Sequence, residues 1–262
     1  MTWHHSGLSV RGSGHARTGT PCQDAQSILA TDTLLILAVA DGAGAAEHAA
    51  LAAELATARA LCWFQEARPL PAGAAAWEAE LRDLLVDLHL SLMAEAERLG
   101  CPACDLACTF LLALVTPDAL VGIQVGDGAI VYRRPPGDAT GDLALLTAPH
   151  QGEYLNETVF LISDTYLQDA QFAYREGAPD GIVVFSDGMQ MLALEMKARP
   201  PVPHAPFFDP LFNFVRGQPD ADQREGQLRA FLESERVCAK TDDDKTLVIA
   251  VRADRSRSGS SA

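Results

Sequence analysis

Aspartates recur in this chain where strand-length apolar runs give way to turns. Four lie beside glycine or another aspartate, and a fifth follows Cys22-Gln23; together they are Asp24, Asp41, Asp127, Asp187 and Asp243. Because each carboxylate leaves an apolar stretch for a turn, the pattern predicts that they converge at one rim of a sheet. A neighbouring glycine lets the backbone approach an ion and exposes a carbonyl oxygen as a further ligand. The pattern therefore favours a site for hard cations.

The same Asp-Gly pairs also have a purely structural interpretation. Aspartate and glycine are ordinary turn residues, so for any one pair the turn alone is the better explanation. Their joint occurrence at three strand ends, with a late aspartate run, favours the metal site. Converging carboxylates repel one another, and such a cluster usually persists with cations present.

Periodicity divides the chain into strands and helices. Helices are expected after residue 44, over about 77–99, after residue 188 and over 223–232. Strands are expected at 8–11, 27–30, 34–40, 109–115, 120–125, 129–133, 143–146, 168–174, 181–185 and 246–251. Turn residues at 116–118 and 126–128 predict hairpins. The segment 199–217, rich in proline and phenylalanine, is interpreted as a loop or flap. Strand runs interleaved with helix pairs predict an α+β layered fold.

Charge and hydropathy exclude several classes of protein. The 262 residues carry 20 Lys+Arg against 35 Asp+Glu, a net charge of -15. This balance argues against binding to nucleic acid, which needs a basic surface, and against anionic membranes. No apolar run approaches the roughly 20 residues of a membrane span, and the N-terminus lacks signal-peptide features. We expect a cytoplasmic protein whose six cysteines are reduced thiols.

Six stretches resemble the metal-dependent protein phosphatases of the 2C type, in their compact bacterial branch. They are 15–25 (HARTGTPCQDA), 38–44 (AVADGAG), 108–132, 152–162, 181–194 (GIVVFSDGMQMLAL) and 241–251 (TDDDKTLVIAV), in the order of the family. The resemblance implies a four-layer α-β-β-α sandwich of two antiparallel sheets flanked by helix pairs. The phosphatase domain would cover 1–252, with a flap or helical region at about 196–236, and 253–262 would be a disordered tail.

The resemblance also implies roles for individual residues. Asp41 would bridge two Mg²⁺ or Mn²⁺ ions, the Gly42 carbonyl would complete the shell of one, and Asp187 and Asp243 would bind the other. Asp24 would hold metal-bound water, and Asp127 would support a third, weaker ion. The implied reaction is hydrolysis of phosphoserine and phosphothreonine in proteins by a water that the metals activate. A phosphorylated protein would be the substrate, and a Ser/Thr kinase would act in opposition.

Three positions depart from the pattern of the family. Gln23 stands where Glu is frequent, Gly19 where an arginine commonly grips phosphate, and Ala43 where some members have a histidine that acts as general acid. Arg17 is the candidate phosphate-binding residue in place of Gly19. His15 is the candidate proton donor, although an ordinary loop histidine is an equally good interpretation.

Two alternatives to the phosphatase remain open from the sequence. A catalytically weak pseudophosphatase would keep the fold as a regulatory binding module; the three departures favour it, and the intact Asp41, Asp187 and Asp243 oppose it. A structural calcium module is opposed by the dispersed aspartates. Cys101 and Cys104 have the spacing of a zinc ligand pair, but no second such pair exists, so unligated thiols are the preferred interpretation.

Overall fold

Two five-stranded antiparallel sheets form the centre of the molecule in a computed structural model, which describes residues 1–65, 69–135, 142–150 and 158–253. The first sheet has the order β1 (Trp3–Val10), β12 (Lys245–Arg252), β9 (Gly181–Phe185), β6 (Ala129–Arg133) and β7 (Leu143–Thr147). The second has the order β2 (Asp24–Ala30), β3 (Leu35–Asp41), β4 (Phe110–Val115), β5 (Ala119–Val125) and β8 (Gln171–Glu176). A short hairpin joins β10 (Leu194–Glu195) to β11 (Val202–Pro203).

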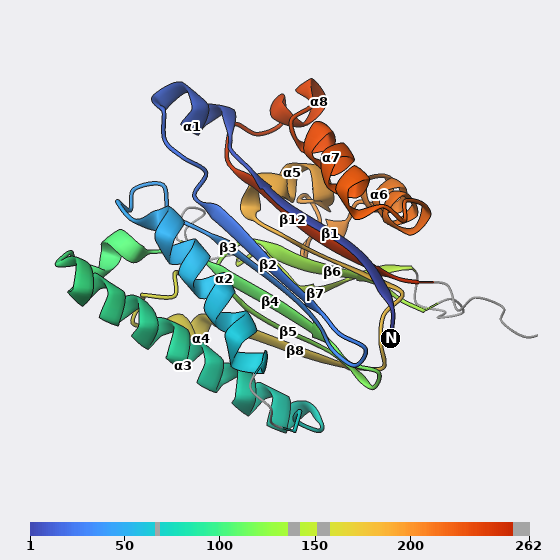
Figure 1. Cartoon of the computed structure of the whole chain (residues 1–262), viewed down its shortest axis with the longest axis horizontal. Helices are drawn as coiled ribbons and strands as arrows, with labels where there is room; N and C mark the ends of the chain where they lie inside the picture. The colour runs from blue at the N-terminus through green and yellow to red at the C-terminus, as the bar shows by residue number, and fades with distance from the viewer. Residues whose placement is uncertain (66–68, 136–141, 151–157, 254–262) are drawn as a thin grey trace, which may run out of the picture.

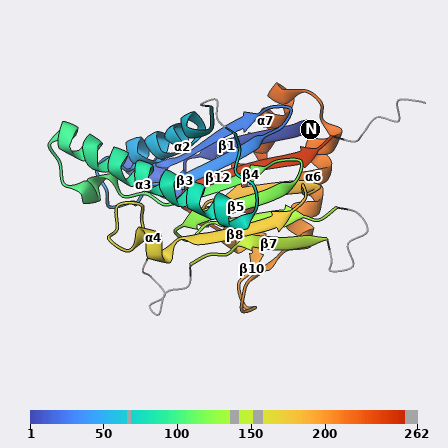
Figure 2. The same ribbon diagram turned by 90° about the horizontal axis from the view of Figure 1, so that it is seen from below.

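Helices cover both outer faces of this sandwich (Figures 1 and 2). The second sheet carries α2 (Ala49–Gln65) and α3 (Ala74–Leu99), with α4 (Tyr166–Asp169) against α3. The first sheet carries α6 (Ala205–Gly217) and α7 (Ala221–Leu232), followed by α8 (Glu235–Cys238). Short helical segments complete the chain: α1 (Ser13–Thr18), η1 (Ala103–Leu106), η2 (Asp187–Met189) and α5 (Gln190–Ala193). The predicted four-layer α-β-β-α sandwich is therefore confirmed.

Three apolar cores hold the four layers together. One lies between α2–α3 and the second sheet, one between the two sheets, and one between the first sheet and α6–α7. Alternation along β3 shows the division: Leu35 and Leu37 face the other sheet, whereas Ile36 and Ala38 face the helices. A strand buried on both faces has no polar side, which explains the continuous apolar runs in the sequence. Among the described helices, none is both long enough and apolar enough to cross a membrane.

The helix expected over 77–99 is confirmed as α3, and its end has the expected cause. Trp77, Leu81, Leu84, Leu85, Leu88 and Leu92 are all buried on one side of the helix. Gly100 follows in the left-handed conformation at φ 71°, and its N–H bonds to a carbonyl of the last turn. Glycine adopts this conformation without the steric cost of a Cβ atom, so it ends the helix.

The hairpin predicted at residues 126–128 is wrong. β4 and β5 do form a hairpin, but β5 pairs with β4 and β8, while β6 pairs with β7 and β9 in the other sheet. Gly126 to Gly128 is therefore a crossing between the sheets. Turn residues record that the chain changes direction; they do not record which strand the next one pairs with. This crossing carries Asp127 to the end of the sandwich.

The loop or flap predicted at 199–217 is also wrong, because α6 begins at Ala205. Its buried residues Phe207, Phe208, Leu211, Phe212 and Val215 recur at helical spacing. Pro206 lies in the first turn, where the missing N–H costs nothing, and the apolar face outweighs the interior Pro210. The strand predicted at 168–174 begins later, since Tyr166–Asp169 forms α4 and β8 starts at Gln171.

Packing of α6 on β9 generates a test of the fold. A Cβ atom on Gly181 would overlap the ring of Phe212, which is fully buried. We expect Gly181→Ala to lower the free energy of unfolding by about 1–3 kcal/mol, as overpacking does. Gly226→Ala is the matched control, because Gly226 lies in the exposed interior of α7 with open space around it. It should stabilise by about 0.5–1 kcal/mol. Urea unfolding measures both, and equal effects would contradict this packing.

Candidate active site

Carboxylates from distant segments meet at one end of the sandwich. Asp41 is the last residue of β3, Asp127 lies on the crossing from β5 to β6, Asp187 follows β9, and Asp243 precedes β12. All four line a cavity of about 190 Å³, together with Gly42 and His15. The convergence predicted from the sequence is thus present. A larger cavity lies between α6 and α7, but most of its lining is apolar and it lacks such a cluster.

Asp24 lies outside the lining of this cavity, buried directly beside it. It pairs with Asp41 across β2 and β3, so the two carboxylates stand opposite each other on adjacent strands. The hydroxyl of Ser186 donates to Asp24 Oδ2 over 2.7 Å and accepts from the N–H of Thr246 over 3.0 Å. Like charges placed directly opposite on a sheet are unfavourable, so this pair needs either a proton or a cation between them.

The pKa values of three carboxyls are raised accordingly. Burial is the main cause for Asp24, whose pKa rises to about 7 against the hydrogen bonds that lower it. Burial also raises the pKa of Asp41 well above its ordinary range, with further contributions from the charges of Asp24 and Asp187. For Asp187, burial and the charges of Asp127 and Asp243 raise the pKa to about 6. The metal-free cluster therefore retains protons near neutral pH.

The glycines that follow two of the aspartates are required for close packing as well as for the turns. A Cβ atom on Gly188 would overlap the carbonyl oxygen of Asp244, so the loop before β12 can lie against η2 only because residue 188 is glycine. A Cβ atom on Gly42 would stand 2.7 Å from the backbone of Ala49 at the start of α2. In both places glycine allows a neighbouring segment to press the aspartate into the cluster.

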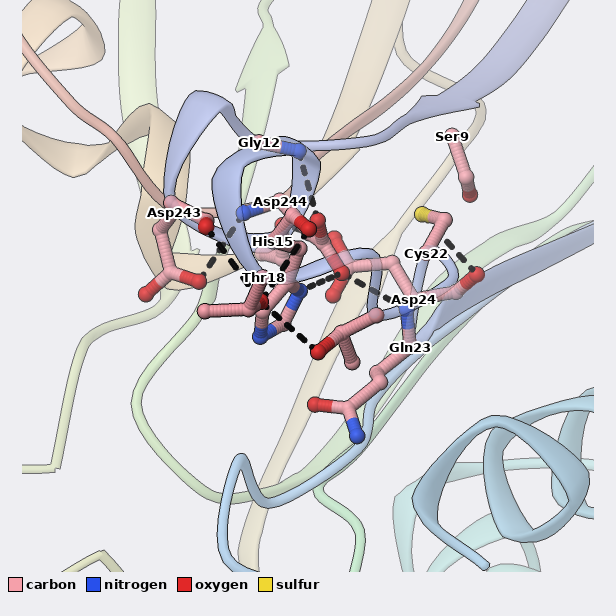
Figure 3. Close-up of polar contacts among 12 residues, drawn as sticks. Ser9, Gly12, His15, Thr18, Cys22, Gln23, Asp24, Asp243 and Asp244 are labelled. Atoms are coloured by element: carbon pink, nitrogen blue, oxygen red, sulfur yellow. Dashed lines mark hydrogen bonds and ion pairs between the residues drawn. The ribbon is translucent and has the colours of Figure 1, made fainter.

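Asp244 is a site residue that the sequence did not single out. Its side chain is 2% exposed and accepts three hydrogen bonds from two other segments (Figure 3). The N–H groups of Gly12 and Gln23 each donate over 2.6 Å, and His15 Nδ1 lies 2.9 Å from Asp244 Oδ2. The run of three aspartates was a visible signal, but a run does not tell which member points inward.

The two candidates near α1 have different surroundings. His15 lines the cavity with a side chain that is 22% exposed and bonded to Asp244. Arg17 is 67% exposed, pairs with Asp242 over 3.0 Å and does not line the cavity.

Thr109 and Thr158 were not predicted as site residues. The Thr109 hydroxyl accepts a hydrogen bond from the Asp41 N–H over 3.0 Å, and the Thr158 hydroxyl donates one to Asp127 over 2.8 Å.

The oxygen atoms available here fit a divalent cation. Asp24 Oδ1, Asp187 Oδ1 and Gln23 Oε1 are buried and have no hydrogen-bond partner. A buried oxygen without a partner costs about 1–3 kcal/mol, and a cation would satisfy it. Within the described ranges, no three His, Cys, Asp or Glu side chains already form a ready-made ligand set around one ion. Small side-chain movements of the carboxylates would be part of binding.

The raised pKa values predict how the metal-free protein responds to pH. Between the ordinary value of 3.8 and about 7, folded Asp24 holds a proton that the unfolded chain has released. Stability is therefore lost as pH rises through this window. Asp24→Asn cannot titrate, so in chelator it should lose part of this dependence and gain about 1–3 kcal/mol at pH 8.

The measurement is urea unfolding in chelator at pH 5 and pH 8. Asp164→Asn serves as control, because Asp164 is exposed and does not line the cavity. If the Asp24→Asn protein kept the full pH dependence of the parent, protonation of Asp24 would not be its source.

Comparison with known proteins identifies a family and a relative. Residues 11–233 match the family model described as protein phosphatase 2C. The chain is 33% identical to Serine/threonine-protein phosphatase 3 of Escherichia coli (strain K12), over 97% of this chain and 100% of that protein.

Two solved structures share the fold. Serine/threonine phosphatase Stp1 from Staphylococcus aureus superposes with a TM-score of 0.65 at 16% identity, over 96% of each chain. RsbX in complex with magnesium superposes with a TM-score of 0.56 at 12% identity, over 95% of this chain and 94% of that one. The family match, the curated relative and the shared fold together show that this chain belongs to the protein phosphatase 2C family.

Proposed function

We propose that this chain hydrolyses phosphoserine and phosphothreonine in proteins with the help of divalent cations at the carboxylate cluster. The observation that carries the proposal is the convergence of Asp41, Asp127, Asp187 and Asp243 on one cavity. The chain is a serine/threonine phosphatase of the 2C type. Which ions it uses, which residues hold them and which phosphoproteins it meets are the parts proposed here.

The proposed ligands are all oxygen donors, as Mg²⁺ and Mn²⁺ prefer. Asp41 would be shared between two ions, with the Gly42 carbonyl on one and Asp187 and Asp243 on the other. Asp24 would act through a water molecule, and Asp127 would serve a third ion. When bound, the cations supply the Lewis acidity that activates a water molecule and neutralises the phosphoryl oxygens. The related RsbX structure is a complex with magnesium, which supports this choice of ion.

His15 is the proposed proton donor to the departing serine or threonine oxygen. The Asp244 carboxylate has no hydrogen to give, so His15 Nδ1 must donate to it and the hydrogen-bond distance of 2.9 Å fits this role. Nε2 is the other ring nitrogen, and it can donate a proton to the departing oxygen from the wall of the cavity only when the ring carries hydrogens on both nitrogens. Because Asp244 is buried and bonded to two backbone N–H groups, it holds the ring in one orientation.

Arg17 stays a prediction as a phosphate-binding residue, since it would have to leave Asp242 to reach the cavity. The opposing Ser/Thr kinase and a cytoplasmic location also stay predictions. The pseudophosphatase alternative is not favoured, because the departures at Gln23 and Ala43 leave the carboxylate cluster intact. The sequence of residues 152–158 predicts either a loop at the sheet edge or a substrate-facing rim; residues 152–157 lie outside the described ranges, and Thr158 lines the cavity.

Metal dependence is the first test of this proposal. Hydrolysis of a phosphoserine peptide and of p-nitrophenyl phosphate should require Mn²⁺ or Mg²⁺ and stop in chelator. Asp41→Asn should lower kcat roughly 10²-fold or more, because the shared ligand is lost. Asp187→Asn and Asp243→Asn should raise the metal concentration required by about 10–100-fold, and Asp127→Asn should do so less.

Thermal melts with and without Mn²⁺ separate function from folding in these variants. Asp41→Asn replaces a carboxyl group whose ionisation is opposed by burial and by neighbouring charges, so its metal-free melting temperature should be unchanged or higher, with a smaller shift on adding Mn²⁺. Asp164→Asn, on the surface, should behave as the parent protein. Wild-type turnover with a full Mn²⁺ shift in Asp41→Asn would remove Asp41 from the shared position, and a parent protein inactive with every metal would favour the pseudophosphatase.

The role of His15 is tested by comparing leaving groups. A serine alkoxide needs a proton as it departs, whereas p-nitrophenolate is a weak base and does not. His15→Asn should therefore lower kcat for the phosphoserine peptide by about 10²–10⁴-fold and change p-nitrophenyl phosphate turnover little. Equal losses for both substrates would indicate a structural role, through Asp244, in place of proton transfer.

A further inference from the structure

An apolar groove lies on the helical face of the first sheet, outside the carboxylate cluster. We call it the α6–α7 groove: α6 contributes Phe207, Leu211 and Phe214, and α7 contributes Leu228 and Phe231. Its volume is about 620 Å³, which is large enough to take several side chains of a partner. The residues from α6 recur every three or four positions, so the groove follows the helix as a continuous stripe.

A large apolar side chain is exposed to solvent at the mouth of the groove. Met191 of α5 is 67% exposed, the highest value among the large apolar side chains that the structure describes. An exposed methionine is flexible and polarizable, and such residues are frequent on surfaces that bind peptides by adapting to them. Apolar surface of this kind next to a groove is typical of an interaction site.

The rim of the groove is basic in a chain that is strongly acidic. Arg236 and Lys240 line it, are exposed, and form no ion pair with any residue the structure describes. The acidic residue of the lining, Glu195, lies 3.3 Å from His204. Although the whole chain has a net charge of -15, the rim of the groove is positively charged and therefore complements carboxylates.

A short segment of the chain connects the groove to the carboxylate cluster. Asp187 begins η2, and Met191 follows it four residues later as the second residue of α5. The Gln190 side chain donates to the carbonyl of Asp127. A segment seated in the groove would thus lie close to a phosphorylated residue at the cluster. This proximity favours the substrate over a partner that binds elsewhere.

We propose that the α6–α7 groove docks an amphipathic, acidic segment of the phosphoprotein substrate. This inference rests on the proposed function. The apolar face of the segment would enter the groove, and its carboxylates would meet Arg236 and Lys240. The C-terminal residues 254–262 of this chain cannot be the occupant, because they contain no large apolar side chain and carry two arginines.

Direct binding is the first test. The probe is a fluorescein-labelled synthetic helix with leucine at every third or fourth position and glutamate elsewhere; a scrambled peptide of equal composition is its control. Fluorescence anisotropy with the Mn²⁺-loaded full chain should show at least tenfold tighter binding of the amphipathic peptide. Met191→Glu, or Arg236→Glu with Lys240→Glu, should weaken it at least tenfold.

Matched controls exclude a general effect of charge. Leu90→Glu changes another exposed apolar side chain, on α3, and Arg175→Glu reverses a charge on β8, both on the opposite side of the sandwich. Both should bind the probe as the parent does. Equal binding of the two peptides, or equal losses in control and groove variants, would overturn the proposal. So would a dimer, seen by light scattering, that Met191→Glu dissociates.

Kinetics connect the groove to the substrate. A phosphoserine peptide joined to the amphipathic segment should have a KM at least tenfold lower than the same phosphopeptide alone, and Met191→Glu should abolish the difference. Turnover of p-nitrophenyl phosphate should be unchanged in the groove variants. Equal KM values in the parent would overturn the docking proposal while leaving the phosphatase intact. Absence of hydrolysis with every substrate and metal would instead be a failure of the proposed function.

Discussion

The buried carboxylate of Asp244 ties together the segments that build the active site. It accepts hydrogen bonds from Gly12 before α1 and from Gln23 before β2, and it contacts His15 between them. Because a carboxylate that is 2% exposed must keep these partners, the N-terminal segment is held against the start of β12. Asp24 and Asp243 are the immediate neighbours of the bonded residues. Their positions in the cluster therefore depend on Asp244.

The cluster itself is an unfavourable arrangement for a protein without cations. Burial and mutual repulsion raise the pKa values of Asp24, Asp41 and Asp187, so folding works against their ionisation. The surrounding apolar cores provide the stability that tolerates this, since β9 before Asp187 is buried throughout and β3 is buried up to Asp41. Cations would relieve both the repulsion and the unpartnered oxygens. Cation binding and folding would then be linked at this end of the sandwich.

Next to the carboxylate cluster, on the helical face of the first sheet, the lining changes from acidic to mostly apolar. η2 and α5 leave the cluster at Asp187 and within a few residues reach the apolar α6–α7 groove at Met191. In the proposed function, one short helical segment would supply both a metal ligand and a docking surface. The cavity could then remain small and unselective, because recognition of the protein substrate would take place beside it. This division suits a phosphatase, since the phosphate group is the same in every substrate.

Much of the fold and most of the cluster could be predicted from sequence. Apolar periodicity located α3 and β9, and the aspartates at strand ends indicated a cation site, because local patterns record burial and turns. Pairing between distant strands leaves no such pattern, which is why the crossing at Asp127 was expected to be a hairpin. α6 was missed because its prolines obscured an apolar face that only packing on the sheet reveals. The sequence by itself determined the layers and which carboxyl groups gather at one end of the sandwich. Only the tertiary structure decided that Asp244 points inward beside His15 and that an apolar groove lies open next to the cluster, since both depend on contacts between residues far apart in the chain.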